Sequence, residues 1–108
     1  MNLKSILVGI DGLKAMGNLD LEISSVECDY RTVKDGSLFV AIKGFAVDGH
    51  NFIESAIKNG ATAILVQEGC DLKSYNIPID MNTNNTSAKI LKHPIIEHFI
   101  NFLLSAFL

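Results

Sequence analysis

Apolar residues recur along the chain in three patterns that predict different elements. Over residues 2–10 they fall at helical spacing, which predicts a short amphipathic helix. Over residues 19–24 they alternate with polar residues, as in a strand with one wet face, and Val26 and Cys28 are compatible with its extension. Over residues 38–42 the apolar run is unbroken, which is typical of a strand buried on both faces.

A helix is predicted after the loop that follows this buried strand. Residues 43–50 form the loop, and Asn51 is the expected helix N-cap, with Glu54 placed to reach back to it. Gly60 suits the helix end because glycine can adopt a positive φ. Residues 61–66 form a second apolar β run. Strand, loop, helix and strand in this order have the spacing of a right-handed βαβ unit, so an α/β fold is expected.

The last third of the chain is predicted to lie partly outside this domain. Residues 77–79 (Ile-Pro-Ile) resemble a short edge strand, and residues 82–88 are a polar loop or linker. Apolar residues in 90–108 fall mostly on one face of a helix. We therefore expect one domain over 1–81, then a polar linker and an apolar helical tail over 82–108. Three interpretations of this tail stay open. It can be a helix packed on the domain, a surface-seeking tail or a non-native sequence end.

Composition and charge narrow the function classes. A chain of 108 residues is enough for one hydrophobic core and not for two. The net charge is −3 and the nine basic residues are scattered, which argues against nucleic-acid binding. There is no secretory signal and no span long enough for a bilayer, so we expect a cytoplasmic protein. Cys28 and Cys70 are expected as reduced thiols, although a disulfide stays open.

Residues 44–51 hold the best local candidate for ligand binding. Their glycines have the GxxxxG spacing of a phosphate loop, but His50 and Asn51 stand where that loop needs Lys and Ser or Thr, so triphosphate hydrolysis is not expected. A loop at the carboxyl end of a buried strand suits an anion or a carbonyl oxygen. A ligand-free βα connection is the alternative.

The other groups of polar residues in the sequence do not predict a catalytic or metal site. In the segment C-D-Y-R at 28–31, Asp29 is predicted either to pair with Arg31 or to cap the following turn. His93 and His98 lack the further ligands of a tetrahedral metal site. No nucleophile–base pair is evident, so we expect neither catalytic residues nor a metal site.

A long ordered string carries a family resemblance. Residues 25–53 read S-V-E-C-D-Y-R-T-V-K-D-G-S-L-F-V-A-I-K-G-F-A-V-D-G-H-N-F-I. This resembles the pattern D-S-R-x-V-x-x-G-x-L-F-V-A-x-K-G-x-x-x-D-G-H-x-F-I of the N-terminal domain of MurE-type Mur ligases. The resemblance covers about residues 3–80 and is densest over 25–68. It implies a small mixed sheet with a βαβ unit flanked by helices.

The resemblance also implies a ligand. In this family the N-terminal domain holds the UDP end of UDP-MurNAc-peptide, a peptidoglycan precursor. The substrate contacts that carry over to this chain are Cys28, Tyr30, Phe45, Ala46 and Val47. Tyr30 departs from the family serine, so a phenol stands where a small hydroxyl is expected.

The family continues into an ATP-binding domain with a G-T-N-G-K-T phosphate loop and then a third domain, and neither follows here. We therefore expect a recognition domain truncated before the ATP-binding domain, which is not an enzyme on its own and has no cofactor of its own. ATP and magnesium would belong to the missing domains. Residues 88–108 read like the foreign ending that a frameshift or truncated gene produces.

Alternative functions stay open. The chain can be a MurF-type N-terminal domain, or one subunit of an enzyme whose catalytic domains lie on another chain. It can also be a remnant that binds no ligand and self-associates through the 90–108 tail.

Overall fold

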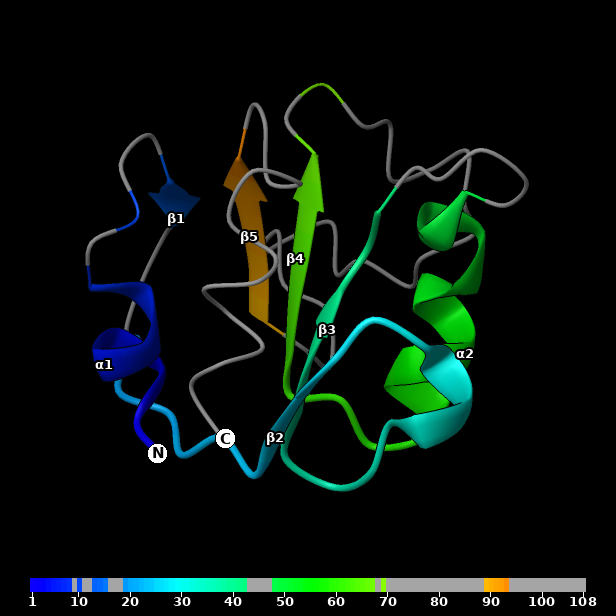
Figure 1. Cartoon of the computed structure of the whole chain (residues 1–108), viewed down its shortest axis with the longest axis horizontal. Helices are drawn as coiled ribbons and strands as arrows, with labels where there is room; N and C mark the ends of the chain where they lie inside the picture. The colour runs from blue at the N-terminus through cyan, green and yellow to red at the C-terminus, as the bar shows by residue number, and fades with distance from the viewer. Residues whose placement is uncertain are drawn as a thin grey trace, which may run out of the picture.

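Nine elements make up the described part of the chain. The computed structural model describes residues 1–8, 10, 13–15, 19–42, 48–67, 69 and 89–93. The elements in chain order are α1 (Leu3–Leu7), β1 (Lys14–Ala15), β2 (Ser25–Glu27), η1 (Tyr30–Thr32), β3 (Ser37–Val40), η2 (Gly49–Phe52), α2 (Ile53–Lys58), β4 (Ala63–Gln67) and β5 (Lys89–His93), where η denotes a 3-10 helix (Figure 1).

The strands form one mixed sheet in the order β1-β5-β4-β3-β2. β2, β3, β4 and β5 pair in parallel, and β1 pairs antiparallel with β5. The segment from β3 through η2 and α2 to β4 is the predicted βαβ unit. The sequence-based expectation of an α/β fold with a small mixed sheet is confirmed.

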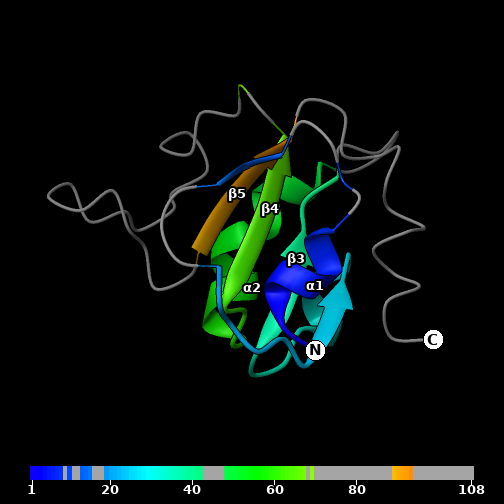
Figure 2. The same cartoon turned by 90° about the vertical axis from the view of Figure 1, so that its left-hand side faces the viewer.

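The central strands are buried on both faces, as their apolar runs predicted. Along β3 and just beyond it, Leu38 and Val40 belong to one hydrophobic cluster, whereas Phe39 and Ala41 belong to another. The first cluster contains the apolar side chains of α1, and the second contains those of α2. Figure 2 shows α1 and α2 on opposite sides of the sheet. The sheet is therefore the middle layer between two helices.

Two buried serine hydroxyls favour the observed register of the edge strand β2. Ser25 lies opposite Ser37, and their hydroxyl oxygens are 2.7 Å apart. The Lys34 backbone N–H also donates to the Ser37 hydroxyl at 3.0 Å. Because buried hydroxyls are costly without partners, a one-residue slip of β2 would be unfavourable.

The predicted helix over 90–108 is wrong at its start, where Lys89–His93 form β5. Ile90 packs against the α2-side cluster and Leu91 lies in the α1-side cluster, so consecutive apolar residues serve opposite faces of the sheet. The sheet therefore continues past residue 81, where the domain was expected to end. Residues 94–108 lie outside the described residues, as do 77–79 and 82–88, and self-association through the tail stays a prediction.

Two other sequence-based boundaries shift. The helix expected over 2–10 is confined to Leu3–Leu7, with Asn2 as its N-cap. The alternating segment 19–24 lies before β2 and contributes only a single bridge between Glu22 and Asn2 in the described structure.

The end of α2 follows the sequence-based prediction. Asn59 is the C-cap and Gly60 has a φ of +114°. A Cβ atom on Gly60 would lie 2.8 Å from the Asp35 Cα atom, and the Gly60 carbonyl accepts the Gly36 N–H at 3.0 Å. Gly60 therefore meets two demands at once, a positive φ and a close approach to the turn before β3.

We expect Gly60→Ala to lower the free energy of unfolding more than Gly69→Ala does. Gly69 also has a positive φ, of +90°, but nothing lies within 4 Å of a Cβ built on it. The control variant thus carries only the backbone strain, about 1–3 kcal/mol. Urea unfolding of both variants measures the difference, and equal losses would show that the contact with Asp35 does not constrain the fold.

Candidate functional site

A pocket of about 510 Å³ opens where the chain leaves two neighbouring parallel strands. One side comes from the four residues that follow β2, and the other comes from the end of β3 and from η2. Small-molecule pockets typically measure about 300–1,000 Å³, and open α/β sheets bind ligands beyond the carboxyl ends of their strands. The lining residues are Cys28, Asp29, Tyr30, Arg31, Ile42, Gly49 and Phe52.

Two of the five predicted substrate contacts, Cys28 and Tyr30, line this pocket together. The other three, Phe45, Ala46 and Val47, lie outside the described residues. Sequence reasoning did not single out Phe52, which directly follows the candidate loop 44–51. Its position next to the predicted loop was the one available signal.

The base of the loop is closed by backbone contact. The Gly49 N–H donates to the Ile42 carbonyl at 2.7 Å. A Cβ atom on Gly49 would lie 2.7 Å from the Ile42 backbone nitrogen, so a side chain at this position would push the two apart. Glycine is required here for a close approach rather than for an unusual φ, and the approach sets the width of the loop where it meets the pocket.

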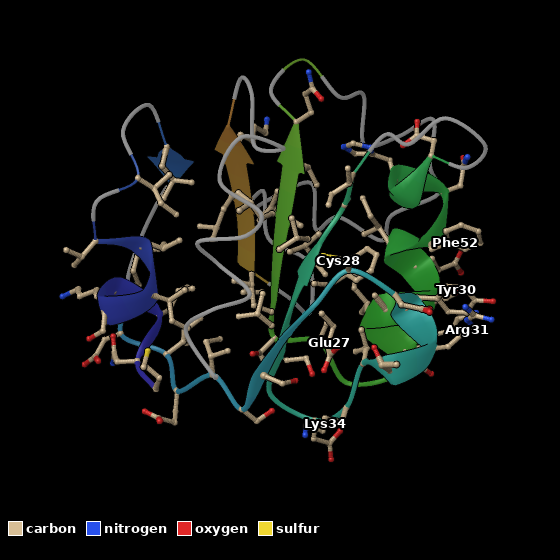
Figure 3. The ribbon with its side chains drawn as sticks, viewed as in Figure 1. Glu27, Cys28, Tyr30, Arg31, Lys34 and Phe52 are labelled. Atoms are coloured by element: carbon tan, nitrogen blue, oxygen red, sulfur yellow. The ribbon has the colours of Figure 1, made fainter. Side chains whose placement is uncertain are left out.

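Two aromatic rings stack across the pocket wall. The centroids of Tyr30 and Phe52 are 4.6 Å apart and their planes differ by 12° (Figure 3). Such pairs contribute about 0.5–1.5 kcal/mol beyond the burial of their area. The Asn59 side-chain amide also donates to the Tyr30 carbonyl at 2.9 Å, which fixes η1 against the end of α2. Tyr30 is therefore held by its ring and by its backbone.

Asp29 both caps η1 and pairs with Arg31, so both sequence-based alternatives are realised. Its Oδ1 accepts the Arg31 backbone N–H at 2.9 Å. The Arg31 Nε donates to Oδ1 at 3.0 Å and Nη2 donates to Oδ2 at 2.7 Å. The hydrogen bonds from Arg31 lower the pKa of Asp29 from its ordinary 3.8 to about 2. The same contacts raise the pKa of the Arg31 guanidinium.

The environment of Cys28 disfavours its thiolate form. Burial, with a smaller effect from the negative charge of Glu27, raises the pKa of its thiol from 9.0 to about 11. Because the thiolate is the reactive form, the neutral thiol serves as a small apolar part of the wall. Cys28 is a free cysteine in the structure.

The helix start also differs from expectation. Asp48, and not Asn51, provides the cap, since its Oδ1 accepts the His50 N–H at 3.0 Å. A 3-10 turn, η2, precedes α2, and α2 itself begins without a side-chain cap.

Within the described residues, no group of three His, Cys, Asp or Glu side chains is arranged to hold a metal ion. Within the same residues, no helix has the length and apolar character needed to cross a membrane.

Replacing Arg31 should return the pKa of Asp29 toward 3.8. The lowered pKa means that the pair stabilises the fold above about pH 3.8, and that this contribution disappears as the pH falls through about 2. A carboxyl ¹³C NMR titration of Arg31→Leu measures the shift. Lys34→Ala is the matched control because Figure 3 shows Lys34 well away from Arg31. An Asp29 pKa that stays near 2 in Arg31→Leu would refute the assigned cause.

Comparison with known proteins gives a consistent family. The family described as "Mur ligase family, catalytic domain" matches residues 22–107. This match extends past residue 82, where the pattern recognised in the sequence ended. A UDP-N-acetylmuramoyl-L-alanyl-D-glutamate–2,6-diaminopimelate ligase of Clostridioides difficile is 38% identical over 90 residues, which are 83% of this chain and 19% of that protein.

Other relatives agree. The ligase of the same name from Bacteroides fragilis is 48% identical over 68 residues, 63% of this chain and 14% of that protein. A UDP-N-acetylmuramoyl-L-alanyl-D-glutamate–L-lysine ligase of Staphylococcus epidermidis is 31% identical over 90% of this chain and 20% of that protein. The chain thus spans 14–20% of the length of these relatives.

A solved structure, a MurF ligase of Thermotoga maritima in complex with ADP, has 38% sequence identity and a TM-score of 0.41, covering 44% of this chain and 11% of that one.

The family match spans about four fifths of the sequence and includes every described residue that lines the pocket. The chain belongs to the Mur ligase family.

Proposed function

We propose that the pocket beside Tyr30 and Phe52 binds the uridine diphosphate end of UDP-N-acetylmuramoyl-L-alanyl-D-glutamate. The chain would then be the substrate-recognition part of a MurE-type ligase of peptidoglycan synthesis. The observation that carries the proposal is the pocket itself, which joins the segment after β2 to the base of the predicted loop after β3, at Ile42 and Gly49. The family pattern implied contacts in these same two segments.

The aromatic pair supports a planar ligand. Tyr30 and Phe52 are stacked with each other and both line the pocket, so a planar ligand would extend the stack on a ring face that the partner ring does not cover. A base stacked on an aromatic side chain gains about 1–3 kcal/mol. Where the family pattern has a serine hydroxyl, this chain would use a ring face for the uracil.

Arg31 is the cation among the described lining residues and suits the diphosphate. Its Nε and Nη2 groups donate to Asp29, and a guanidinium carries five N–H donors. The bonds to Asp29 fix the orientation of the side chain and leave donors for phosphate oxygens. Phe45, Ala46 and Val47 complete the proposed contacts, because they lie in the chain between Ile42 and Gly49, which both line the pocket.

The names of the relatives support the choice of ligand. The ligases quoted above share UDP-N-acetylmuramoyl-L-alanyl-D-glutamate and differ in the amino acid, 2,6-diaminopimelate or L-lysine. We assign recognition of the shared part to this chain. Formation of the amide bond, with ATP and magnesium, is assigned to the parts of such ligases that this chain does not span, because the chain covers only 14–20% of the length of these relatives.

Isothermal titration of the chain with UDP-N-acetylmuramoyl-L-alanyl-D-glutamate and with UDP tests the proposal. We expect both to bind, and Tyr30→Ala to weaken UDP binding about 5- to 150-fold, the equivalent of about 1–3 kcal/mol of stacking. Lys34→Ala, away from the pocket, should bind as the unaltered chain does. No heat at millimolar ligand would refute the proposal.

Tyr30→Ser separates stacking from crowding, because it restores the residue of the family pattern. If the phenol ring supports the base, the serine variant binds UDP more weakly than the unaltered chain. Tighter binding by the serine variant would mean that Tyr30 obstructs the pocket.

A further inference from the structure

His50 is a buried polar residue within the wall of the pocket that does not line the pocket itself. It belongs to η2, between Gly49 and Phe52, which do line it. Its relative exposure is 3%, and its ring points into the protein. Nδ1 lies 2.7 Å from the Asp48 carboxylate, and Nε2 accepts the Gln67 backbone N–H at 3.1 Å.

These partners determine which ring nitrogen carries the proton. A backbone N–H can only donate, so Nε2 must be the unprotonated acceptor. The proton therefore sits on Nδ1 and is donated to Asp48. With this tautomer both ring nitrogens are satisfied, as a buried imidazole requires.

The contacts form a continuous link from the sheet to the pocket. Gln67 is the last residue of β4, and Asp48 is the residue that caps η2. The chain of bonds runs from the Gln67 N–H through the imidazole to Asp48, whose Oδ1 also accepts the His50 backbone N–H. A second link, from the Gly49 N–H to the Ile42 carbonyl, joins η2 to the end of β3. η2 is thus tied to two adjacent strands.

We propose that His50 is a positioning residue for nucleotide binding, which acts through η2 by holding Gly49 and Phe52 against the carboxyl ends of β3 and β4. The proposal rests on the assignment of the pocket to UDP, but the link it describes is present without a ligand. Without the bond to Gln67, η2 loses one of the ties that hold it to the carboxyl ends of the strands. Phe52 and its stack with Tyr30 would shift with any movement of η2.

Three substitutions at His50 test the two hydrogen bonds of its ring separately. His50→Gln places an amide oxygen near the Nε2 position, where it can accept the Gln67 N–H. His50→Asn places an amide N–H near the Nδ1 position, where it can donate to Asp48. His50→Leu retains apolar bulk and makes neither bond. If the bond to β4 positions the pocket wall, the glutamine variant is the one of the three that keeps the wall in place.

The experiment titrates UDP into the full chain and the three variants, with circular dichroism to verify folding. We expect His50→Leu and His50→Asn to bind about ten-fold more weakly, the lower end of the losses seen when a residue that orients a metal ligand is removed. His50→Gln should restore most of the affinity. Equal affinity of folded His50→Leu and the unaltered chain, or no rescue by glutamine, would overturn the inference.

Ligand-free NMR keeps the inference separate from the proposed function and from failure to fold. In the unaltered chain, long-range ¹H–¹⁵N spectra should show Nε2 of His50 without a proton, and a protonated Nε2 would overturn the inference. The Phe52 ring resonances should be unchanged in His50→Gln and shifted in His50→Leu. If the unaltered chain does not bind UDP, the proposed function fails, whereas these resonances still decide whether His50 positions the wall.

Discussion

Burial of β3 and β4 on both faces is the constraint on which the rest of the structure depends. Phe39 and Ile64 face one side and Leu38 and Leu65 face the other, all at 0% exposure. Parallel strands of this kind need a helix on each face, and α2 and α1 provide that cover. Because successive parallel strands run the same way, the chain leaves β2 and β3 at the same edge. The two segments that build the pocket are neighbours for that reason.

The two pocket segments start in the same way and then diverge. Each begins a 3-10 turn with an aspartate whose carboxylate accepts the backbone N–H two residues on, from Arg31 at 2.9 Å and from His50 at 3.0 Å. In each turn the side chain at that second position bonds the same carboxylate. The arginine points outward and is 74% exposed, whereas the histidine is buried against β4. One turn thus carries an exposed arginine paired with its own aspartate, and the other anchors the opposite wall.

The sequence predicted what depends on local pattern. The buried runs at 38–42 and 61–66 and the glycine at the end of α2 were predicted because periodicity and backbone conformation are local properties. The helix expected from residue 90 was wrong at β5, since the apolar pair Ile90 and Leu91 fits a helix face and also fits a strand packed on both sides. The stack of Tyr30 on Phe52 could not be predicted, because it joins residues 22 positions apart that only the parallel pairing brings together.

Charge balance in the pocket indicates what kind of recognition it can perform. Asp29 offsets Arg31, the raised pKa of Cys28 keeps its thiol neutral, and the remaining described walls are apolar, aromatic or backbone. Such a lining attracts a charged ligand weakly at long range, so discrimination by the proposed pocket would come from direct contact with an aromatic ring and with donors already oriented by their own carboxylate. Rigid placement of η1 and η2 would favour such contact because less freedom is lost on binding. The hydrogen bonds that Asp29, Asp48 and His50 accept, and the one that Asn59 donates, accordingly join the walls of the pocket to one another and to the sheet.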